Sequence, residues 1–525
     1  MKERIYKLCL NNKFNILLFM SIIICFTISF SDMRCKIVNN ETASQHSLLL
    51  NLLFIGISII LTAIIIFVIK KIKNKDFDKK IPKIFLITSI ILGSVYMFLS
   101  PMFSGSDEHN HYYRIYEITE GVMRTPTSDT VGSNLPESLS QAFIDAGNDN
   151  INIKYNSILK MLKIKLNKNE RIQYGYTWNR QYNNTALYSP IQYAPHAIGF
   201  FIGKIFDFGP LTIGMLGRLF NLIAYIILGY LCLKIIPKSK LFYLLILLSP
   251  NMLQCATTLS ADSFTNVIFL LFVALVLKFS YENKKITTLN EVVLFILSAV
   301  ISLCKIVYLP AVFLILLIGR EKFGNKKYNK LIYCTITIVF TVLISLLWIR
   351  STNGVFNIAY DQSELQKHFI LTNPFGYIII FLRTIAIYIV KYIECLFVGT
   401  TMYHSQLQMP AIISFSYVAI VVLSLLKDNN KNKYSLVQKS LVGFIALAIT
   451  GLAVTAIYVQ CTAQFYKVAN PTIEGVQGRY FIPVIMLIPL IFKIKEFKIN
   501  SYKLYKALLT INLITWFYML SRFML

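Results

Sequence analysis

Long apolar runs, separated by short clusters of lysine and arginine, recur along the whole of this 525-residue chain. A helix needs about 20 consecutive apolar residues to cross the hydrocarbon core of a bilayer. Only 15% of the residues are charged, whereas an average soluble domain carries about a quarter. The pattern therefore predicts an integral membrane protein with many crossings, and it excludes a soluble domain held by a single anchor.

We expect an all-α polytopic fold with about 13 transmembrane helices. The expected crossings are residues 14–31, 48–70, 83–100, 211–236, 241–258, 263–281, 290–305, 306–319, 331–349, 409–426, 437–460, 479–493 and 507–525. Lys305 and Pro310 interrupt the stretch 290–319, which predicts a tight helical hairpin. The apolar stretches 190–206 and 375–400 contain prolines or charged residues, so we expect interfacial or re-entrant helices on the outer side there.

The distribution of basic residues gives the expected orientation. The net charge of +27 first suggests nucleic acid, but the lysines and arginines lie in short clusters between apolar runs. This indicates the positive-inside rule and attraction to anionic membrane lipids, with no nucleic-acid partner. With the amino terminus in the cytoplasm, the inner loops hold 31 basic residues and the short outer loops hold five. We therefore expect a multi-pass protein whose polar loop 101–189 is extracytoplasmic.

The long outer loop begins with the strongest candidate site. Ser106 is typical of a helix N-cap, so we expect Asp107 and Glu108 in the first turn of a helix. Asp107, His111 and Arg114 then share one helix face. A carboxylate near the positive end of a helix stays ionised and can act as a base or a ligand. Two alternatives stay open: the acids are ordinary capping residues, or Asp107, Glu108 and His111 hold a divalent metal.

Two further clusters lie at the membrane edge. Tyr188 and Tyr193 stand beside prolines, and their rings suit either an aromatic belt or stacking on a sugar. Arg479, with Gln477 and Tyr480 beside it, lies at the outer mouth of a late crossing. An arginine at such a position either snorkels toward water or pairs with a lipid phosphate, which its planar guanidinium can bind through two hydrogen bonds.

Two more charged residues lie inside or beside expected crossings. Arg218 falls within the span 211–236, where snorkelling and anion binding are again the alternatives. Asp262 lies in a very short outer turn, where it either caps the following helix or contributes to a site.

Taken in order, these residues resemble a bacterial family of polytopic membrane proteins known as a domain of unknown function. The resemblance covers about residues 83–495, leaving 1–82 as two additional crossings and 496–525 as a last helix. It rests on Asp107-Glu108 with His111, Arg114 and Gly121; Tyr188-x-Pro190 and Tyr193-x-Pro195; Gly217-Arg218-Leu219 with Asn221; Ser260-x-Asp262; and Gln477-Gly478-Arg479-Tyr480-Phe481-x-Pro483. That family is similar in layout to the GT-C glycosyltransferases.

The GT-C layout implies a transferase that moves a sugar from a polyprenyl-phosphate carrier to a cell-envelope acceptor, on the outer face of the bacterial plasma membrane. It implies Asp107 or Glu108 as catalytic base and Arg479 as the partner of the carrier phosphate. The residues that it implies for substrate binding are His111, Arg114, Tyr188, Tyr193, Arg218, Asp262, Gln477, Arg479 and Tyr480. It requires no cofactor and leaves a divalent cation open.

Two other function classes remain. One is a transporter or flippase of lipid-linked saccharides, and the other is a polymerase or ligase that transfers a whole glycan. Charges at outer mouths and a long outer loop favour the enzyme over the flippase, because flippases usually carry charge in mid-span.

Overall fold

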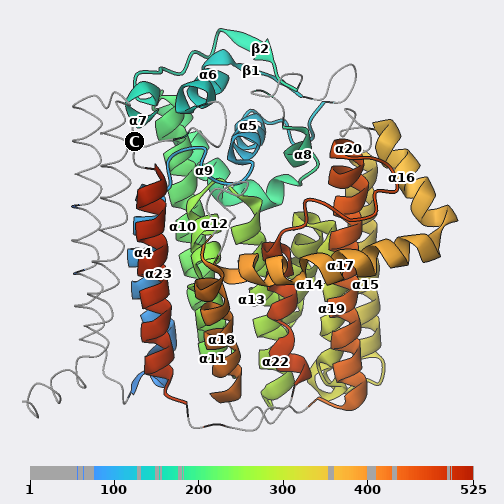
Figure 1. Ribbon diagram of the computed structural model, residues 1–525. Helices are drawn as coiled ribbons and strands as arrows, with labels where there is room; N and C mark the ends of the chain where they lie inside the picture. Colours follow the sequence, from blue (N-terminus) through green and yellow to red (C-terminus); the bar gives the residue numbers. More distant parts are fainter. Residues whose placement is uncertain are drawn as a thin grey trace, which may run out of the picture.

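The structure is a computed structural model that is mostly helical, with long helices side by side and a smaller segment across one end (Figure 1). It describes residues 56, 63, 76–126, 132–147, 153, 157–175, 180, 182–352, 360–398, 409–427, 434–492, 497 and 499–523. The expected crossings 14–31 and 48–70 thus lie outside the described residues, apart from single positions.

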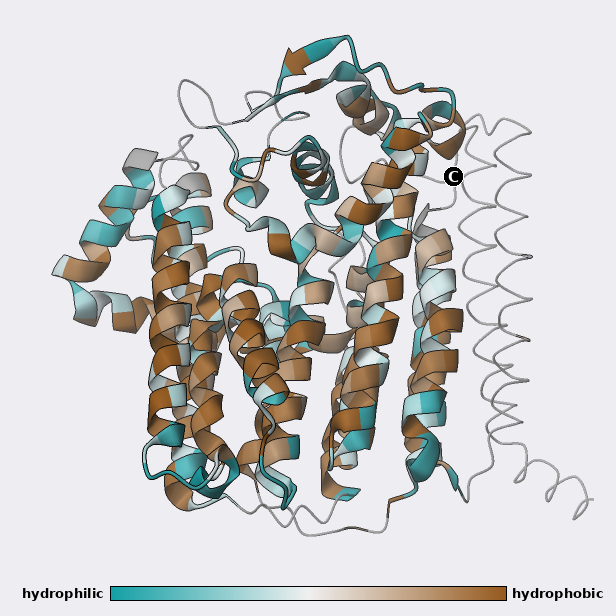
Figure 2. Ribbon diagram, turned by 180° about the vertical axis from the view of Figure 1, so that it is seen from behind, coloured by the Kyte–Doolittle hydropathy of each residue, from teal (hydrophilic) through white to brown (hydrophobic). Residues whose placement is uncertain are grey.

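Five helices in the described part are long and apolar enough to cross a membrane. These crossings contain the helices α4 (Ile81–Leu99), α10 (Pro210–Ile235), α13 (Ala261–Tyr281), α15 (Asn329–Ser351) and α19 (Leu436–Ile457). The short turn η2 (Asp78–Lys80) directly precedes α4. Figure 2 shows that the shafts of the long helices are hydrophobic, whereas both ends of the molecule are hydrophilic. This banding is the arrangement that a bilayer requires, and the chain is a multi-pass membrane protein.

The expectation of about 13 long crossings is not confirmed, because several expected crossings are short or broken. Prolines begin many of these pieces, since proline lacks the N–H that would continue the preceding helix. The pieces are α11 (Lys240–Leu247), α12 (Pro250–Thr257), α14 (Thr288–Cys304), η4 (Ile306–Leu317), α18 (Ala411–Lys427), η8 (Gly478–Phe481), α21 (Ile482–Ile485) and α22 (Ile488–Ile491).

The predicted break at Lys305 is confirmed. Lys305 is extended, with φ −147° and ψ 119°, between α14 and the 3₁₀ helix η4, which contains Pro310. The far ends of the two helices meet again, because the Ile286 N–H donates to the Lys322 carbonyl at 2.9 Å. The stretch is therefore a helical hairpin with Lys305 at its turn, followed by the short turn η5 (Arg320–Phe323).

The described residues of the segment 101–189 fold compactly across one end of the bundle (Figure 1). Its strands pair antiparallel, with Asn134 opposite Gln173. Its own apolar core includes the fully buried rings of Tyr112, Tyr113 and Tyr174. The elements are α5 (Glu108–Thr119), β1 (Asn134–Pro136), α6 (Glu137–Ala146), α7 (Ser157–Met161), β2 (Arg171–Gln173) and α8 (Asn183–Ala186).

The two apolar stretches that were not expected to cross have different forms. The first is a 3₁₀ turn η3 (Pro190–Tyr193) followed by α9 (Ala194–Ile205), whose 12 residues are too short to span a bilayer. The second is α17 (Pro374–Phe397), which follows α16 (Tyr360–Thr372) and runs across the long helices rather than along them (Figure 1).

The remaining helices complete the bundle. The helix α19 continues through a π-helical turn η7 (Tyr458–Thr462) into α20 (Ala463–Phe465). The last helix, α23 (Ser501–Phe523), packs against α4 and α18. Its Asn512 accepts a hydrogen bond from the Tyr96 hydroxyl at 3.1 Å, which fixes it to α4.

Candidate functional site

One buried carboxylate joins two cations where three irregular segments meet. Asp262, in the first turn of α13, forms an ion pair with Lys305 through Oδ1 and with the Arg479 Nε through Oδ2 at 3.0 Å. The Ser260 hydroxyl accepts from the Asp262 N–H at 3.2 Å and begins the helix there. The Asp262 and Lys305 side chains are each 12% exposed and that of Arg479 is 8% exposed, so the cluster is nearly enclosed.

Lys305 reaches this cluster because the chain turns at its position. In a continuous helix the next residue would follow the helical path, but the extended Lys305 backbone ends α14 and starts η4. Its ammonium lies 5.2 Å from the ring centre of Tyr480 and 5.8 Å from that of Tyr188. Sequence reasoning treated Lys305 as a helix break alone; a lysine inside an apolar run is itself a signal of function.

Arg479 has hydrogen-bonding capacity left over. Its guanidinium carbon lies 5.6 Å above the Tyr480 ring, and its Nε faces Asp262. Among the described residues, its two terminal nitrogens, Nη1 and Nη2, have no acceptor. Beside it, the buried Gln477 Oε1 is also without a partner in the described part of the chain. The site is thus positively charged and keeps a guanidinium edge unused.

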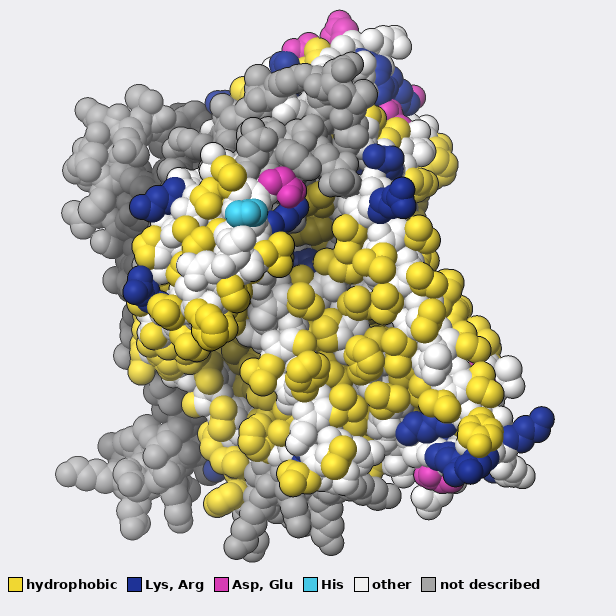
Figure 3. Space-filling view, turned by 90° about the vertical axis from the view of Figure 1, so that its right-hand side faces the viewer, with side chains coloured by type: hydrophobic (Ala, Val, Ile, Leu, Met, Phe, Trp, Pro, Cys, Tyr) yellow, Lys and Arg dark blue, Asp and Glu magenta, His cyan; other side chains and the backbone are white. Residues whose placement is uncertain are grey.

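A cavity of about 310 Å³ adjoins the cluster. Lys305, Tyr188, Tyr308 and Tyr480 line it, together with residues of α14, α15, α16 and α19. On α15 and α19 only 22% of the apolar stretch is buried within the protein, so much of the surface of these two membrane-crossing helices is exposed. Figure 3 shows a hollow in the molecular surface, with charged side chains at its rim and a broad hydrophobic surface underneath.

Two residues of α5 complete the surroundings of the cluster. His111 shares a hydrogen bond of 2.7 Å with the Tyr193 hydroxyl and lies within electrostatic range of Asp262, Arg479 and Lys305. Burial lowers the pKa of His111 to about 3, so its ring is neutral at neutral pH. Asp107 is half-buried and interacts electrostatically with Arg479.

The start of α5 differs from the expected N-cap. Asp107, not Ser106, is the N-cap residue, and it has a left-handed backbone with φ 54°. Such a conformation is costly for a residue with a side chain and is often found at functional sites. The helix α5 therefore begins at Glu108, and Asp107 lies before its first turn rather than within it.

Glu108 is not available as a base or a metal ligand, contrary to one alternative from the sequence. Its carboxylate pairs with Arg218 through two contacts of 2.7 Å, and both side chains are fully buried. The N–H groups of Gly105 and Leu259 also donate to it, each at 2.8 Å. Arg218 in turn donates to the carbonyls of residues 100 and 101. Arg218 is therefore neither snorkelling nor binding an external anion; the pair joins α5 to α10.

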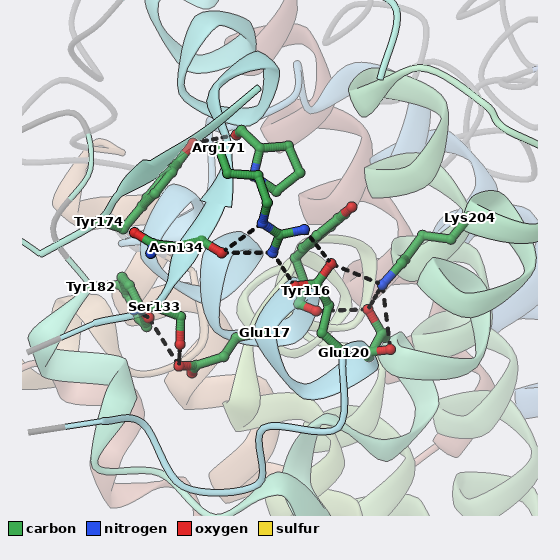
Figure 4. Close-up of polar contacts among 11 residues, drawn as sticks. Tyr116, Glu117, Glu120, Ser133, Asn134, Arg171, Tyr174, Tyr182 and Lys204 are labelled. Carbon is green, nitrogen blue, oxygen red and sulfur yellow. Dashed lines mark hydrogen bonds and ion pairs between the residues drawn. The ribbon is translucent and has the colours of Figure 1, made fainter. Parts of the chain in front are cut away.

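Arg114 also belongs to the framework rather than to the site. It is fully buried and pairs with Glu117 at 2.6 Å, and it donates to the Met123 carbonyl. Figure 4 shows Glu117 of α5 bonded to Ser133 and Tyr182, and Glu120, which directly follows α5, bonded to Arg171 and to Lys204 of α9. Arg114 therefore has its shortest contacts in this network, and one longer bond of 3.4 Å, to the Tyr188 carbonyl, reaches toward the cluster.

The described part of the chain contains no cluster of side chains that could bind a metal ion. No group of three or more histidine, cysteine, aspartate or glutamate side chains there is placed to hold an ion. The expected set of Asp107, Glu108 and His111 is divided, since Glu108 is bound by Arg218 and His111 by Tyr193.

Fold and site together define a polytopic, mostly helical membrane protein with a cationic cluster at one end of its bundle. The chain belongs to the family described as "Predicted membrane protein (DUF2142)", whose model matches residues 90–488. No curated protein and no solved structure matches the chain.

Proposed function

We propose that this protein is a GT-C-type membrane glycosyltransferase that moves a sugar from a polyprenyl-phosphate carrier to a cell-envelope acceptor. The observation that carries the proposal is the Asp262–Lys305–Arg479 cluster beside a cavity that the membrane-crossing helices α15 and α19 help to line. A prenyl chain needs an apolar, membrane-embedded surface, and its phosphate needs cations nearby. The unused nitrogens of Arg479 match a phosphate, because a guanidinium binds two phosphate oxygens at once.

The proposed chemistry assigns each neighbouring residue a role. The acceptor hydroxyl oxygen attacks the anomeric carbon of the donor sugar, and the bond from that carbon to the phosphate oxygen breaks. The electron pair of this bond stays on the phosphate, where Arg479 and Lys305 stabilise the added charge. Asp107 takes the proton of the acceptor hydroxyl. Asp262 holds the two cations apart and in position before the donor arrives.

The proposed orientation places this chemistry on the extracytoplasmic face. The cluster lies at the end of the bundle that the segment 101–189 covers, and the basic loop 320–330 lies at the other end (Figures 1 and 3). Basic residues favour the cytoplasmic side, which makes the end with the cluster the outer one.

A transfer assay with purified protein tests the proposal. The protein is reconstituted in liposomes with polyprenyl-linked hexoses and an acceptor fraction from cell envelopes. Movement of labelled sugar to the acceptor, with release of the lipid phosphate, is the expected result. Movement of the intact lipid-linked saccharide across the bilayer, with no transfer, would instead support a flippase.

A further inference from the structure

The charges beside the cavity nearly cancel. Lys305 and Arg479 each carry one positive charge and share the single negative charge of Asp262. Glu364 and Lys367, which also line the cavity, pair with each other at 2.5 Å and contribute nothing to the sum. The described charges at the cavity and the cluster therefore sum to +1.

This sum discriminates between two kinds of lipid-linked sugar. A sugar joined to its carrier through one phosphate is a phosphodiester with one negative charge, whereas a pyrophosphate linkage carries two. A buried charge without a counter-charge is costly. From this balance we infer that the donor is a sugar linked through a single phosphate and not through a pyrophosphate, an inference that rests on the proposed function.

The neighbouring groups strengthen the preference. His111 is neutral at neutral pH and adds no positive charge. Asp107 lies within electrostatic range of Arg479, and counting it lowers the sum to zero. Either sum accommodates a second negative charge less well than the first.

The hydrogen-bond donors and the volume agree with a small phosphodiester. Its phosphorus carries two non-bridging oxygens, which the Nη1 and Nη2 of Arg479 can bind in parallel. A pyrophosphate presents four such oxygens. The cavity of about 310 Å³ also lies at the low end of ligand sites, which range over roughly 300–1,000 Å³.

Binding of two sugar-free lipids tests the inference without a transfer step. The probes are decaprenyl methyl phosphate, with one charge, and decaprenyl methyl pyrophosphate, with two, added to the full-length protein in nanodiscs. We expect the phosphodiester to bind at least about 10-fold more tightly. Asp262→Asn raises the summed charge of the site by one. It should reduce the ratio of the affinity for the phosphodiester to that for the pyrophosphate by about 10-fold.

Lys326→Gln is the control, because it removes a cation from an exposed position in the loop after η5, away from the residues that line the cavity. The ratio of the two lipid affinities in this variant should stay within about twofold of the wild-type ratio, since water screens exposed charges. Equal or tighter binding of the pyrophosphate by the wild type overturns the inference, whether or not Asp262→Asn folds. Absence of binding by both lipids overturns it as well. If the protein prefers the phosphodiester but transfers no sugar, the proposed function is wrong and the inference about the phosphate linkage stands.

Discussion

At the scale of single residues, two adjacent carboxylates have opposite surroundings. Glu108 is fully buried, and Arg218 and two backbone N–H groups use its oxygens. Asp107 is half-buried, has a left-handed backbone and interacts electrostatically with Arg479. The first arrangement stabilises the fold, and the second places a half-buried carboxylate within electrostatic range of the cluster.

The same substitution at both positions separates these roles. Asp107→Asn should keep the wild-type unfolding temperature and lower the transfer rate by about 10²-fold or more, the scale of general-base loss. Glu108→Gln should destabilise the protein by about 3–5 kcal/mol, because Arg218 remains buried without a counter-charge. Transfer rates and thermal unfolding in detergent measure both effects. An inactive but stable Glu108→Gln protein, with normal activity in Asp107→Asn, would reverse the assignment.

At the scale of elements, the site depends on places where helices end or break. Asp262 begins α13, Lys305 forms the turn between α14 and η4, and Arg479 lies in η8. The turn η8 approaches α17 closely at Gly478. A Cβ atom there would lie 2.2 Å from the Tyr392 carbonyl oxygen and 2.8 Å from the Cys395 carbonyl carbon. Glycine at 478 therefore sets the distance between α17 and the Arg479 backbone.

Gly478→Ala should force η8 away from α17 and move Arg479 from Asp262. A shift of about 1 Å at a site of this kind can lower the rate about 10²-fold. Gly443→Ala on α19 is the control, since a Cβ there meets nothing within 4 Å. It should leave transfer unchanged and keep or raise stability, because alanine favours helices by about 1 kcal/mol over glycine. Full activity in Gly478→Ala would show that the close approach does not position Arg479.

At the scale of the whole molecule, three histidines are buried in or beside the segment 101–189. His109 stacks on Phe143 with ring centres 4.2 Å apart, while His111 and His196 lie near Tyr193. Burial lowers the pKa of each imidazole to about 3, from 6.5 for an exposed group. Below pH 6.5 the unfolded chain therefore binds protons that the folded protein does not, so stability falls as the pH falls.

Thermal unfolding between pH 7 and pH 5 measures this linkage. We expect the unfolding temperature to decrease toward pH 5, and His109→Asn to make that decrease shallower, because one proton-binding difference is removed. An unfolding temperature that is constant or rises toward pH 5 would contradict neutral, buried histidines.

The orientation of the whole molecule is tested by labelling. Asn169→Cys lies at an exposed position of the segment 101–189, and Lys326→Cys lies in the basic loop after η5. In intact cells, a membrane-impermeant maleimide should label the first above the background of native cysteines and leave the second unlabelled. The opposite pattern would place the cluster on the cytoplasmic side.

The sequence predicts the helical class, the positions of the long helices and the hairpin at Lys305 because these follow from local apolar length and from charged or proline residues. It also identifies Asp262 and Arg479 as candidates. It cannot show that they share one site, since that contact joins residues more than 200 positions apart. For the same reason it does not show the partners of Arg114 and Glu108, which depend on tertiary packing and on the left-handed backbone at Asp107.

The transfer rate of Arg479→Lys tests the central claim, that the cluster holds the carrier phosphate, most directly. Lysine keeps the charge but lacks the planar fork, so the rate should fall about 10²-fold while unfolding stays near that of the wild type. Arg350→Lys, at an exposed position of α15, is the control and should retain the wild-type rate. Wild-type transfer and lipid-phosphate binding by both Arg479→Lys and Arg479→Ala would contradict the account and remove Arg479 from the site.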